Sequence, residues 1–452
     1  MPRKIVVIGM GYVGIPAAAL FADVPGFEVV GVQRRSERSG WKIDWLNEGR
    51  NPIGGDEPGL DELVERVVKE KGTFSVTDDY SVVADAEAVL IDVQTPTDED
   101  HVPRYESLKA VSAEVAKHLQ DGTLVAIEST VAPGTTEFVV KPILEENSGK
   151  VAGRDFFLAF SYERVMVGRL LKNITDLPRI IGGIDPESTK RAVELYRHIV
   201  KAELHPTDAL TAEIAKVVEN TYRDVNIAFA NEVALICESL GVDVYKVREL
   251  VNTLPNDPSH PPSNPVRNMH WPGAGVGGHC LPKDPWLLKY GLDTYGKTKF
   301  DPKIIVRSRE LNAQMPFHTA NLVEQAMKEA GREMAGAKIC ILGVAFLENS
   351  DDTRNSPSLD LYDELKKRGA EPVLHDPLVR TYERPFSDNL DECLVHSDAI
   401  VLVTKHRQYE DLDFAELKGM VKTAVAVDGR NLWDRKKIED AGFVYRGVGK
   451  PK

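Results

Sequence analysis

A glycine-rich turn close to the start of the chain constrains the fold more than any other feature. Ile5–Ile8 is a short apolar run of the kind that forms a buried parallel strand. Gly9-x-Gly11-x-x-Gly14 follows at once, and then come an alanine-rich helix and a second strand expected over 28–32. In this context the turn binds a dinucleotide, because small residues let the pyrophosphate reach the helix N-terminus. We therefore expect a doubly wound α/β domain whose cofactor contacts Gly9, Gly11 and Gly14, rather than a turn without a ligand.

The end of the second strand departs from the usual dinucleotide pattern. An acid commonly stands there and binds the adenosine ribose, but this chain has Gln33, followed by Arg34 and Arg35. An acid would repel a 2′-phosphate, whereas an arginine can accept one or stack on the adenine. The sequence therefore indicates NAD and leaves NADP open, with Gln33 and Arg34 among the cofactor residues.

Polar turns follow the later strands of this first domain. Strands expected over 86–93 and 124–127 end just before Thr95 and Thr130. In a doubly wound sheet these loops face the ligand crevice, so both threonines are candidate cofactor contacts, or else ordinary loop residues. The next strand leads to Glu163, a carboxylate beside arginines that is either catalytic or part of a surface ion pair.

One long helix without proline or glycine is expected over 208–240, with Asp208 as its N-cap. Lys216, Asn220 and Arg223 fall on one face of it. They form either a solvated stripe or a lysine and an amide directed at a catalytic crevice, and the helix is also a candidate dimer interface. The apolar residues expected to contact the core are Ile214, Val217, Val218, Ile227, Ala228 and Val233.

A second glycine-rich stretch, P-G-A-G-V-G-G-H-C-L-P-K-D-P over 272–285, contains His279-Cys280 and Asp284. Glycines this dense let the backbone pass close to a ligand. We interpret Cys280 as a nucleophile presented by this loop. The alternative is a tight turn that holds a buried cysteine, the usual place for that residue.

The last third of the chain indicates a second α/β unit. Helices are expected over 303–312 and 318–330, and the strands that follow include 399–403, whose sequence echoes the first domain. This copy has only Gly343 in place of the three-glycine turn, so it should not bind a dinucleotide in the same way. Arg354, in its first crossover, suits a diphosphate, unless it is an ordinary surface arginine.

Composition limits the class of protein. A chain of 452 residues is long enough for two or three domains, and a formal net charge of −14 argues against nucleic acid or an anionic membrane as partner. No apolar run approaches the ~20 residues of a membrane helix, and no leader precedes the first strand. The four cysteines are singly placed, which predicts a reducing, cytoplasmic setting with no metal site and no disulfide.

Taken in order, the first glycine turn, the Lys-x-x-x-Asn helix, G-G-H-C-L-P-K-D and D-D-T-R-N-S-P resemble the UDP-glucose/GDP-mannose dehydrogenase family over nearly the whole chain. The P-G-A-G-V-G-G-H-C form is more similar to the branch acting on UDP-N-acetylhexosamines, UDP-N-acetylmannosamine foremost. The resemblance implies two Rossmann-like doubly wound domains joined by a long-helix central domain. It also implies a UDP-sugar substrate and a homodimer or dimer-based oligomer. The implied division is an NAD-binding domain over 1–205, a central helical dimerisation domain carrying the catalytic lysine and cysteine over 206–318, and a UDP-binding domain over 319–452.

The resemblance also assigns roles to residues that match the family motifs. The implied catalytic residues are the nucleophile Cys280, the acid/base Lys216, its helpers Asn220 and Asp284, and Glu163 for the second step. The implied substrate contacts are Arg164, Val165, Lys216, Asn220, Arg223, Gly277, Arg354 and Arg267, the last reaching the neighbouring subunit's site. The implied cofactor contacts are Gly9, Gly11, Tyr12, Val13, Gly14, Gln33, Arg34, Thr95 and Thr130.

Three positions depart from the family pattern. Gln33 replaces the acid after the second strand, Leu347 replaces a lysine, and the histidine expected before Arg267 is missing. The implied reaction is a four-electron oxidation of a primary alcohol through a thiohemiacetal and a thioester on Cys280. Its alternatives are a different sugar (UDP-glucose or UDP-N-acetylglucosamine), a two-electron β-hydroxyacid-type dehydrogenase, and a nucleotide-sensing protein without activity.

Overall fold

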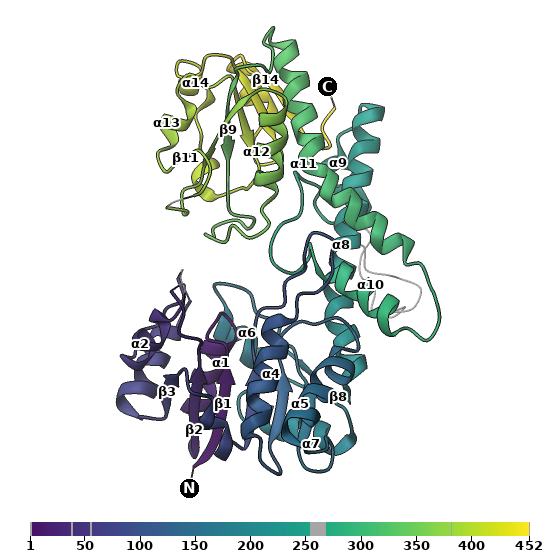
Figure 1. Ribbon diagram of the computed structural model, residues 1–452. Coiled ribbons are helices and arrows are strands. Elements are labelled where there is room, and N and C mark those ends of the chain that lie inside the picture. Colours follow the sequence, from purple (N-terminus) through teal and green to yellow (C-terminus); the bar gives the residue numbers. More distant parts are fainter. Residues whose placement is uncertain (1, 38, 55–56, 254–267, 381, 452) are drawn as a thin grey trace. The chain divides into compact units, whose positions relative to one another are not determined.

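The computed structural model describes residues 2–37, 39–54, 57–253, 268–380 and 382–451 (Figure 1). The chain forms two compact units, Met1–Glu219 with Trp286–Asp301, and Asn220–Pro285 with Pro302–Lys452. The division between them falls within the long helix α8 (Ala209–Leu240). From Trp286 onward, helix α10 (Asp284–Tyr295) belongs to the first unit. The division into three domains at 205 and 318 stays a prediction.

The first unit is built on an eight-stranded sheet with the order β3-β2-β1-β4-β5-β6-β7-β8. Its strands are β1 (Arg3–Ile8), β2 (Phe27–Val32), β3 (Phe74–Thr77), β4 (Ala88–Ile91), β5 (Leu124–Ile127), β6 (Phe157–Phe160), β7 (Arg179–Gly183) and β8 (Leu204–Asp208). All neighbouring strands are parallel except β6 and β7. The first six strands have the order of the dinucleotide-binding fold, as the glycine turn predicts.

Helices cover both faces of this sheet. Along β1, Ile5 and Val7 belong to one buried apolar cluster and Val6 and Ile8 to another. Side chains alternate along a strand, so a run that is apolar throughout needs cover on both sides. The helical segments are α1 (Gly14–Asp23), α2 (Trp41–Asn47), α3 (Leu60–Glu65), η1 (Arg66–Glu70), η2 (Tyr80–Asp85), α4 (Glu106–His118), η3 (Thr136–Val140), α5 (Lys141–Ser148), α6 (Leu170–Asp176) and α7 (Pro186–Tyr196).

The second unit contains a six-stranded parallel sheet with the order β11-β10-β9-β12-β13-β14. Its strands are β9 (Lys338–Leu342), β10 (Glu371–His375), β11 (Phe386–Ser387), β12 (Ala399–Leu402), β13 (Val425–Asp428) and β14 (Val444–Gly447). This is the same winding as the first six strands of the other sheet. The fold class predicted from the sequence, with two Rossmann-like sheets, is confirmed.

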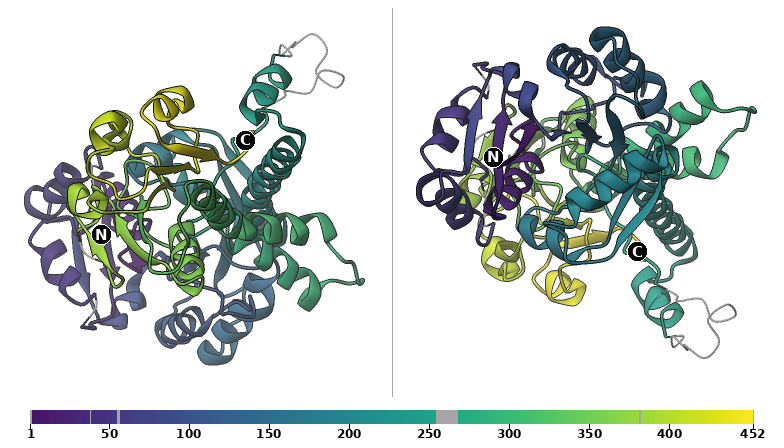
Figure 2. Two further views of the ribbon diagram at one scale, coloured as in Figure 1. Left: turned by 90° about the horizontal axis from the view of Figure 1, so that it is seen from above. Right: turned by 90° about the horizontal axis from the view of Figure 1, so that it is seen from below.

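Helices α11 (Lys303–Glu329) and α12 (Pro357–Lys367) of the second unit lie side by side against this sheet (Figure 1). The helical segments here are α9 (Val244–Val251), α11 (Lys303–Glu329), α12 (Pro357–Lys367), α13 (Leu390–Leu394), η4 (Arg407–Tyr409), α14 (Phe414–Leu417) and α15 (Arg435–Asp440). The C-terminal end of the chain lies beside α9 (Figure 2), where the Val244 amide donates to the Gly449 carbonyl. Lys450 also pairs with Asp243, just before α9, at 2.9 Å.

Helix α11 corrects the expectation of two helices separated near Pro316. It is continuous from Lys303 to Glu329 with Pro316 inside it. An internal proline removes one backbone hydrogen bond and costs about 3 kcal/mol. Here Asn312 and Met315 on one side and Thr319 on the other are fully buried. Packing on both sides of the proline therefore keeps the helix in one piece.

The structure contains a disulfide between Cys340 and Cys393, whereas the sequence analysis predicted no disulfide. Cys340 lies in β9 and Cys393 in α13, with their Cα atoms 5.6 Å apart. The two residues are 53 apart in the sequence, so their spacing gives no sign of the bond. The fold brings α13 against the sheet and makes the pair.

Helix α8 exposes an apolar stripe that the sequence reasoning assigned partly to the core. Val217 and Ala228 are buried as expected, but Ile214 is 39% exposed and Val218 42% exposed. The inward face is made largely of small and polar residues, so the bulky ones at four- and seven-residue spacing lie outside. The members of this α8 stripe are Leu210, Ile214, Val218, Tyr222, Phe229, Ile236 and Leu240. Within the described residues, neither α8 nor any other helix has both the length and the apolarity to cross a lipid bilayer.

Candidate active site

The glycine turn after β1 has the form of a pyrophosphate cradle. Gly9 has a φ of +106°, and a Cβ on it would overlap the Asp92 carbonyl. A Cβ on Gly14 would overlap the Gly9 carbonyl, whereas one on Gly11 would meet nothing within 4 Å. Gly9 and Gly14 thus permit the close packing of the turn, and the space beside Gly11 is open at the start of α1. The turn therefore fits a dinucleotide, with Tyr12 exposed and Val13 half-buried at its helical end.

The two threonines predicted to contact the cofactor lie next to each other. The Thr95 hydroxyl donates to the Thr130 carbonyl at 2.5 Å. The loop after Thr130 is bound in turn by Glu213 of α8, whose carboxylate accepts from the Gly134 and Thr136 amides at 2.6 and 2.8 Å. Burial raises the pKa of Glu213 to about 7. Sequence reasoning missed Glu213, although it stands three residues before Lys216 on the inward face of the helix.

Lys216 is buried, which excludes the solvated-stripe interpretation for this residue. Its ammonium donates to the Glu163 carbonyl at 2.9 Å and lies 5.0 Å from the centre of the Tyr162 ring. The Glu163 carboxylate accepts from the Val165 amide at 2.6 Å. The first unit therefore brings Lys216 and Glu163 together. Arg223, two turns further along α8, is exposed.

The Arg164 side chain is directed at the protein. Its guanidinium bonds the Glu219 carboxylate at 3.0 and 3.1 Å and the Pro178 carbonyl at 2.5 Å. Any contact of Arg164 with a substrate would therefore come from its backbone.

In the second unit, Cys280 begins a tight turn that ends in buried charges. The Cys280 carbonyl accepts from the Lys283 and Asp284 amides at 3.1 and 2.9 Å. The Asp284 carboxylate is fully buried between the Lys283 ammonium, at 2.8 Å, and the Asn220 side-chain amide, at 2.6 Å. Cys280 itself is partly exposed. Three of the predicted catalytic residues, Cys280, Asp284 and Asn220, are thus brought together, and Lys283, to which the sequence reasoning gave no role, joins them.

The imidazole beside the cysteine is neutral. Burial, followed by the charges of Lys283 and Arg354, lowers the pKa of His279 to about 4. A cation near a thiol favours its thiolate form. At neutral pH His279 therefore carries no positive charge that could favour a Cys280 thiolate.

The glycines before Cys280 approach other parts of the protein closely. A Cβ on Gly277 would lie 2.6 Å from the Phe346 Cβ, and one on Gly275 would lie 2.7 Å from Pro357. The Gly278 amide donates to the Arg354 carbonyl at 2.9 Å. The dense glycines therefore let the cysteine loop pack closely on the first crossover of the C-terminal sheet. The predicted substrate contact of Gly277 stays a prediction.

Three family models match this chain in succession. They describe the NAD binding domain, the central domain and the UDP binding domain of one family, and match residues 3–200, 210–314 and 340–435. The chain belongs to the UDP-glucose/GDP-mannose dehydrogenase family. It is therefore an NAD-dependent nucleotide-sugar dehydrogenase, and the cradle beside Gly11 lies in its NAD-binding domain.

Individual relatives are similar over almost their full length. The chain is 37% identical over 447 residues to the UDP-N-acetyl-D-mannosamine dehydrogenase of Pyrococcus horikoshii, covering 99% of each chain. The structure of that archaeon's enzyme superimposes with a TM-score of 0.88 at 37% identity, again over 99% of each chain. The NDP-N-acetyl-D-galactosaminuronic acid dehydrogenase of Methanosarcina mazei Go1 gives a TM-score of 0.90 at 46% identity, covering 99% of this chain and 95% of that one.

A buried polar network, here called the loop clamp, binds both ends of the cysteine loop of this dehydrogenase. The Asp224 carboxylate pairs with the Arg309 guanidinium and accepts from the Asn312 amide at 2.9 Å. Asn312 in turn accepts from Asn231 at 2.8 Å. Asn231 accepts from the Gly273 amide at 2.9 Å, and Arg309 lies 3.5 Å from the Leu281 carbonyl. The clamp thus joins α8 and α11 to the start and end of the loop, and sequence reasoning missed it.

Two arginines of the UDP-binding part have different roles. Arg354 pairs with the Asp352 carboxylate at 2.9 Å. Arg430, also missed from the sequence, is half-buried and donates to the Val403 carbonyl at 2.6 Å and to the Gly275 carbonyl at 3.0 Å. Arg430 therefore supports the cysteine loop from the end of β13. Arg267 lies outside the described residues.

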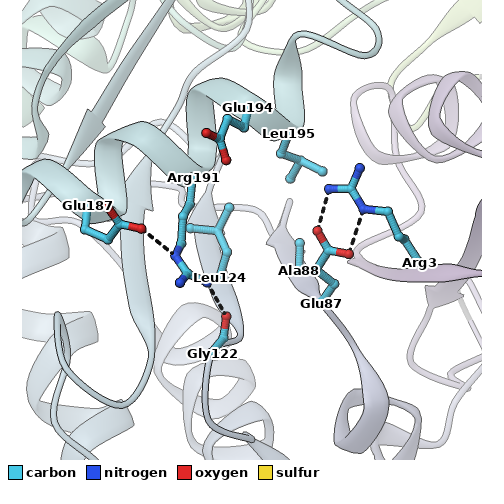
Figure 3. A pocket seen from close by; sticks show the side chains of 9 residues that line it. All are labelled: Arg3, Glu87, Ala88, Gly122, Leu124, Glu187, Arg191, Glu194 and Leu195. Carbon is cyan, nitrogen blue, oxygen red and sulfur yellow. Dashed lines mark hydrogen bonds and ion pairs between the residues drawn. The ribbon is translucent and has the colours of Figure 1, made fainter.

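A cavity of about 160 Å³ lies at the opposite end of the first sheet (Figure 3). It is bordered by the Arg3–Glu87 pair, at the amino ends of β1 and β4, and by Arg191 of α7, which pairs with Glu187 at 3.1 Å. Ligands of this fold bind at the carboxyl ends of the strands. The cavity is therefore separate from the glycine turn after β1.

Proposed function

We propose that the chain catalyses the NAD-dependent four-electron oxidation of the C6 hydroxyl of a UDP-N-acetylhexosamine, UDP-N-acetyl-D-mannosamine, to the uronic acid. The observation that carries the proposal is the turn of Cys280, which combines a partly exposed thiol with the buried Lys283 and Asp284 and the half-buried Asn220. A two-electron alcohol dehydrogenase has no use for a nucleophile in this position. The names of the relatives favour the N-acetylmannosamine sugar.

The first oxidation requires a base for the hydroxyl proton. We assign this to Lys216, which accepts the proton when its amine is neutral. Asp284 holds the Lys283 ammonium and the Asn220 amide, the donors proposed to stabilise the developing alkoxide. Bound NAD supplies the hydride acceptor, in two rounds. The product of the first round is the C6 aldehyde.

The second oxidation requires the thiol. The Cys280 thiolate attacks the aldehyde carbon and forms a thiohemiacetal, which loses a second hydride to become a thioester. Water, positioned by Asn220 and Glu163, then hydrolyses the thioester and restores the thiol. One alcohol, two NAD⁺ and one water thus give one carboxylate, two NADH and three protons.

Further residues are proposed to contact the substrate outside the reacting C6 group. The guanidinium of Arg354 suits the diphosphate, because planar forks of donors bind phosphate oxygens well. Arg223, exposed on α8, and the backbone at Arg164, Val165 and Gly277 complete the proposed set. Arg267 is proposed to reach the site of a neighbouring subunit.

The test is a panel of UDP-sugars with NADH measured by absorbance. UDP-N-acetylmannosamine is expected to give two NADH per sugar and the highest kcat/KM. UDP-N-acetylglucosamine, UDP-N-acetylgalactosamine and UDP-glucose serve as comparisons. One NADH per sugar would instead indicate a two-electron enzyme, and none with any sugar would indicate a nucleotide sensor.

A second sugar is favoured by one observation. The Methanosarcina mazei structure, at 46% identity, is named for an N-acetyl-D-galactosaminuronic acid. UDP-N-acetylgalactosamine is therefore the second candidate. A higher kcat/KM for it in the same panel would replace the mannosamine assignment and leave the chemistry unchanged.

We also propose that the α8 stripe forms the interface of a homodimer. Its seven large apolar side chains follow one side of a single helix, and such continuous apolar surface is uncommon on monomers. Helix pairs of this kind are self-complementary about a twofold axis.

A charge placed in the stripe is expected to separate the dimer. Phe229→Arg should give the mass of one chain in sedimentation equilibrium, where the unmodified protein gives twice that mass. Val151→Arg, at an exposed apolar residue outside the stripe, is the matched control and should remain dimeric. If the Phe229 variant kept the doubled mass and its circular dichroism, the proposed interface would be wrong.

A further inference from the structure

A hydrogen-bonded polar cluster joins the end of β2 to the cofactor turn. The Gln33 side-chain oxygen accepts from the Met10 amide at 3.1 Å, and its nitrogen donates to the Ser39 hydroxyl at 3.0 Å. Ser39 and Ser36 are 3.0 Å apart through their hydroxyls, and the Lys42 ammonium donates to the Met10 carbonyl at 2.9 Å. Met10 directly follows Gly9, so the cluster is attached to the pyrophosphate cradle itself.

In this fold, residues at the position of the cluster contact the adenosine ribose. A carboxylate at the end of β2 normally accepts a hydrogen bond from the ribose 2′-hydroxyl and repels a 2′-phosphate. Here Gln33 carries no charge, and its oxygen is already bonded to the Met10 amide. The feature that excludes NADP from related sites is therefore missing from this one.

The cluster also carries positive charges that neighbouring carboxylates do not neutralise. Lys42 is half-buried, and burial lowers its pKa. Among the described residues, no carboxylate pairs with Lys42 or with the exposed Arg34. Arg35, by contrast, is paired with Asp78 at 3.3 Å. A partly desolvated ammonium without a counter-ion is costly, so this cluster is suited to an anion.

We propose that Arg34, Ser36, Ser39 and Lys42 bind the 2′-phosphate of NADP, so that the enzyme uses NADP as well as NAD. Lysine binds phosphate as a point charge, arginine as a planar fork, and the serine hydroxyls can donate to its remaining oxygens. This inference depends on the NAD site of the family and not on the identity of the sugar.

The first test measures binding without any sugar. Calorimetry of the full chain compares adenosine 2′,5′-bisphosphate with adenosine 5′-monophosphate, which differ only in the 2′-phosphate. The bisphosphate is expected to bind at least tenfold more tightly. Equal affinities would overturn the proposal.

Variants then assign the effect to the cluster. Lys42→Met and Arg34→Ser should each lower the ratio of the two affinities about tenfold, and Arg35→Ser, the matched control, should leave that ratio unchanged. If Lys42→Met weakened both ligands equally, the lysine would serve the pyrophosphate and the proposal would fail for it. Arg34 stacking on adenine would likewise weaken both ligands equally.

The second test compares kcat/KM for NADP and NAD with the best sugar of the panel. The two values are expected to lie within about tenfold of each other. Gln33→Asp restores the acid at the end of β2 and should lower the NADP/NAD ratio at least tenfold. If NADP supports less than a hundredth of the NAD rate, or if Gln33→Asp leaves the ratio unchanged, the proposal is wrong. Because binding is measured without sugar, failure of the proposed sugar reaction would not affect the first test.

Discussion

Cys280→Ser is expected to lower the rate of uronic acid formation by about 10³-fold or more, the size of loss that follows removal of a nucleophile. A serine hydroxyl is scarcely ionised at neutral pH, so it is a far weaker nucleophile than a thiol. The first oxidation needs no thiol, so the variant should still form the C6 aldehyde. Mass spectrometry of the products, with the aldehyde trapped by hydroxylamine, separates the two stages.

The matched control for this change is Cys237→Ala. Cys237 is a buried thiol on α8 that packs in the apolar core of the second unit. Its removal should leave the NADH yield at two per sugar. Undiminished acid formation by Cys280→Ser would reject the covalent route and with it the role proposed for this loop.

Arg309→Met is expected to destabilise the second unit by about 3–5 kcal/mol, since it leaves the buried Asp224 carboxylate without its cation. For a unit of this size, such a loss of stability corresponds to a fall in Tm of roughly 10 °C or more. Arg309 and Asp224 are 4% and 0% exposed, so water cannot replace the lost partner. Differential scanning calorimetry measures the effect.

Arg307→Met is the control on the same helix. Its pair with Glu310 lies on the surface, where ion pairs contribute about 1 kcal/mol or less. Restoring stability by the double change Arg309→Met with Asp224→Leu would support the clamp, because the buried charge is then removed with its partner. A Tm for Arg309→Met equal to that of the control would show that the clamp contributes little.

Both sheets could be predicted from the sequence because their evidence is local. The apolar run 124–127 coincides with β5, and Ile5–Ile8 forms the last four residues of β1. The three-glycine turn identifies the first sheet as a cofactor domain. The span of α8 was predicted within a residue of each end, since the capping residue Asp208 and the stop at Gly241 are adjacent to it. The order of the motifs along the chain indicated the family.

The failures concern residues whose partners are distant in the sequence. The exposure of Ile214 and Val218 depends on which side of α8 faces the core, and the periodicity of a helix that is apolar on two sides does not show this. The same holds for the Cys340–Cys393 disulfide and for the continuity of α11 through Pro316.

The sequence by itself determined the two sheets and the long helix, because strand runs, helix periods and turn glycines are properties of neighbouring residues. Only the tertiary structure decided what supports them. It packs the glycines before Cys280 on Phe346, places Lys283 beside Asp284, and bonds Gln33 to the cofactor turn. Burial and charge pairing depend on contacts between distant segments, and those contacts exist only once the chain has folded.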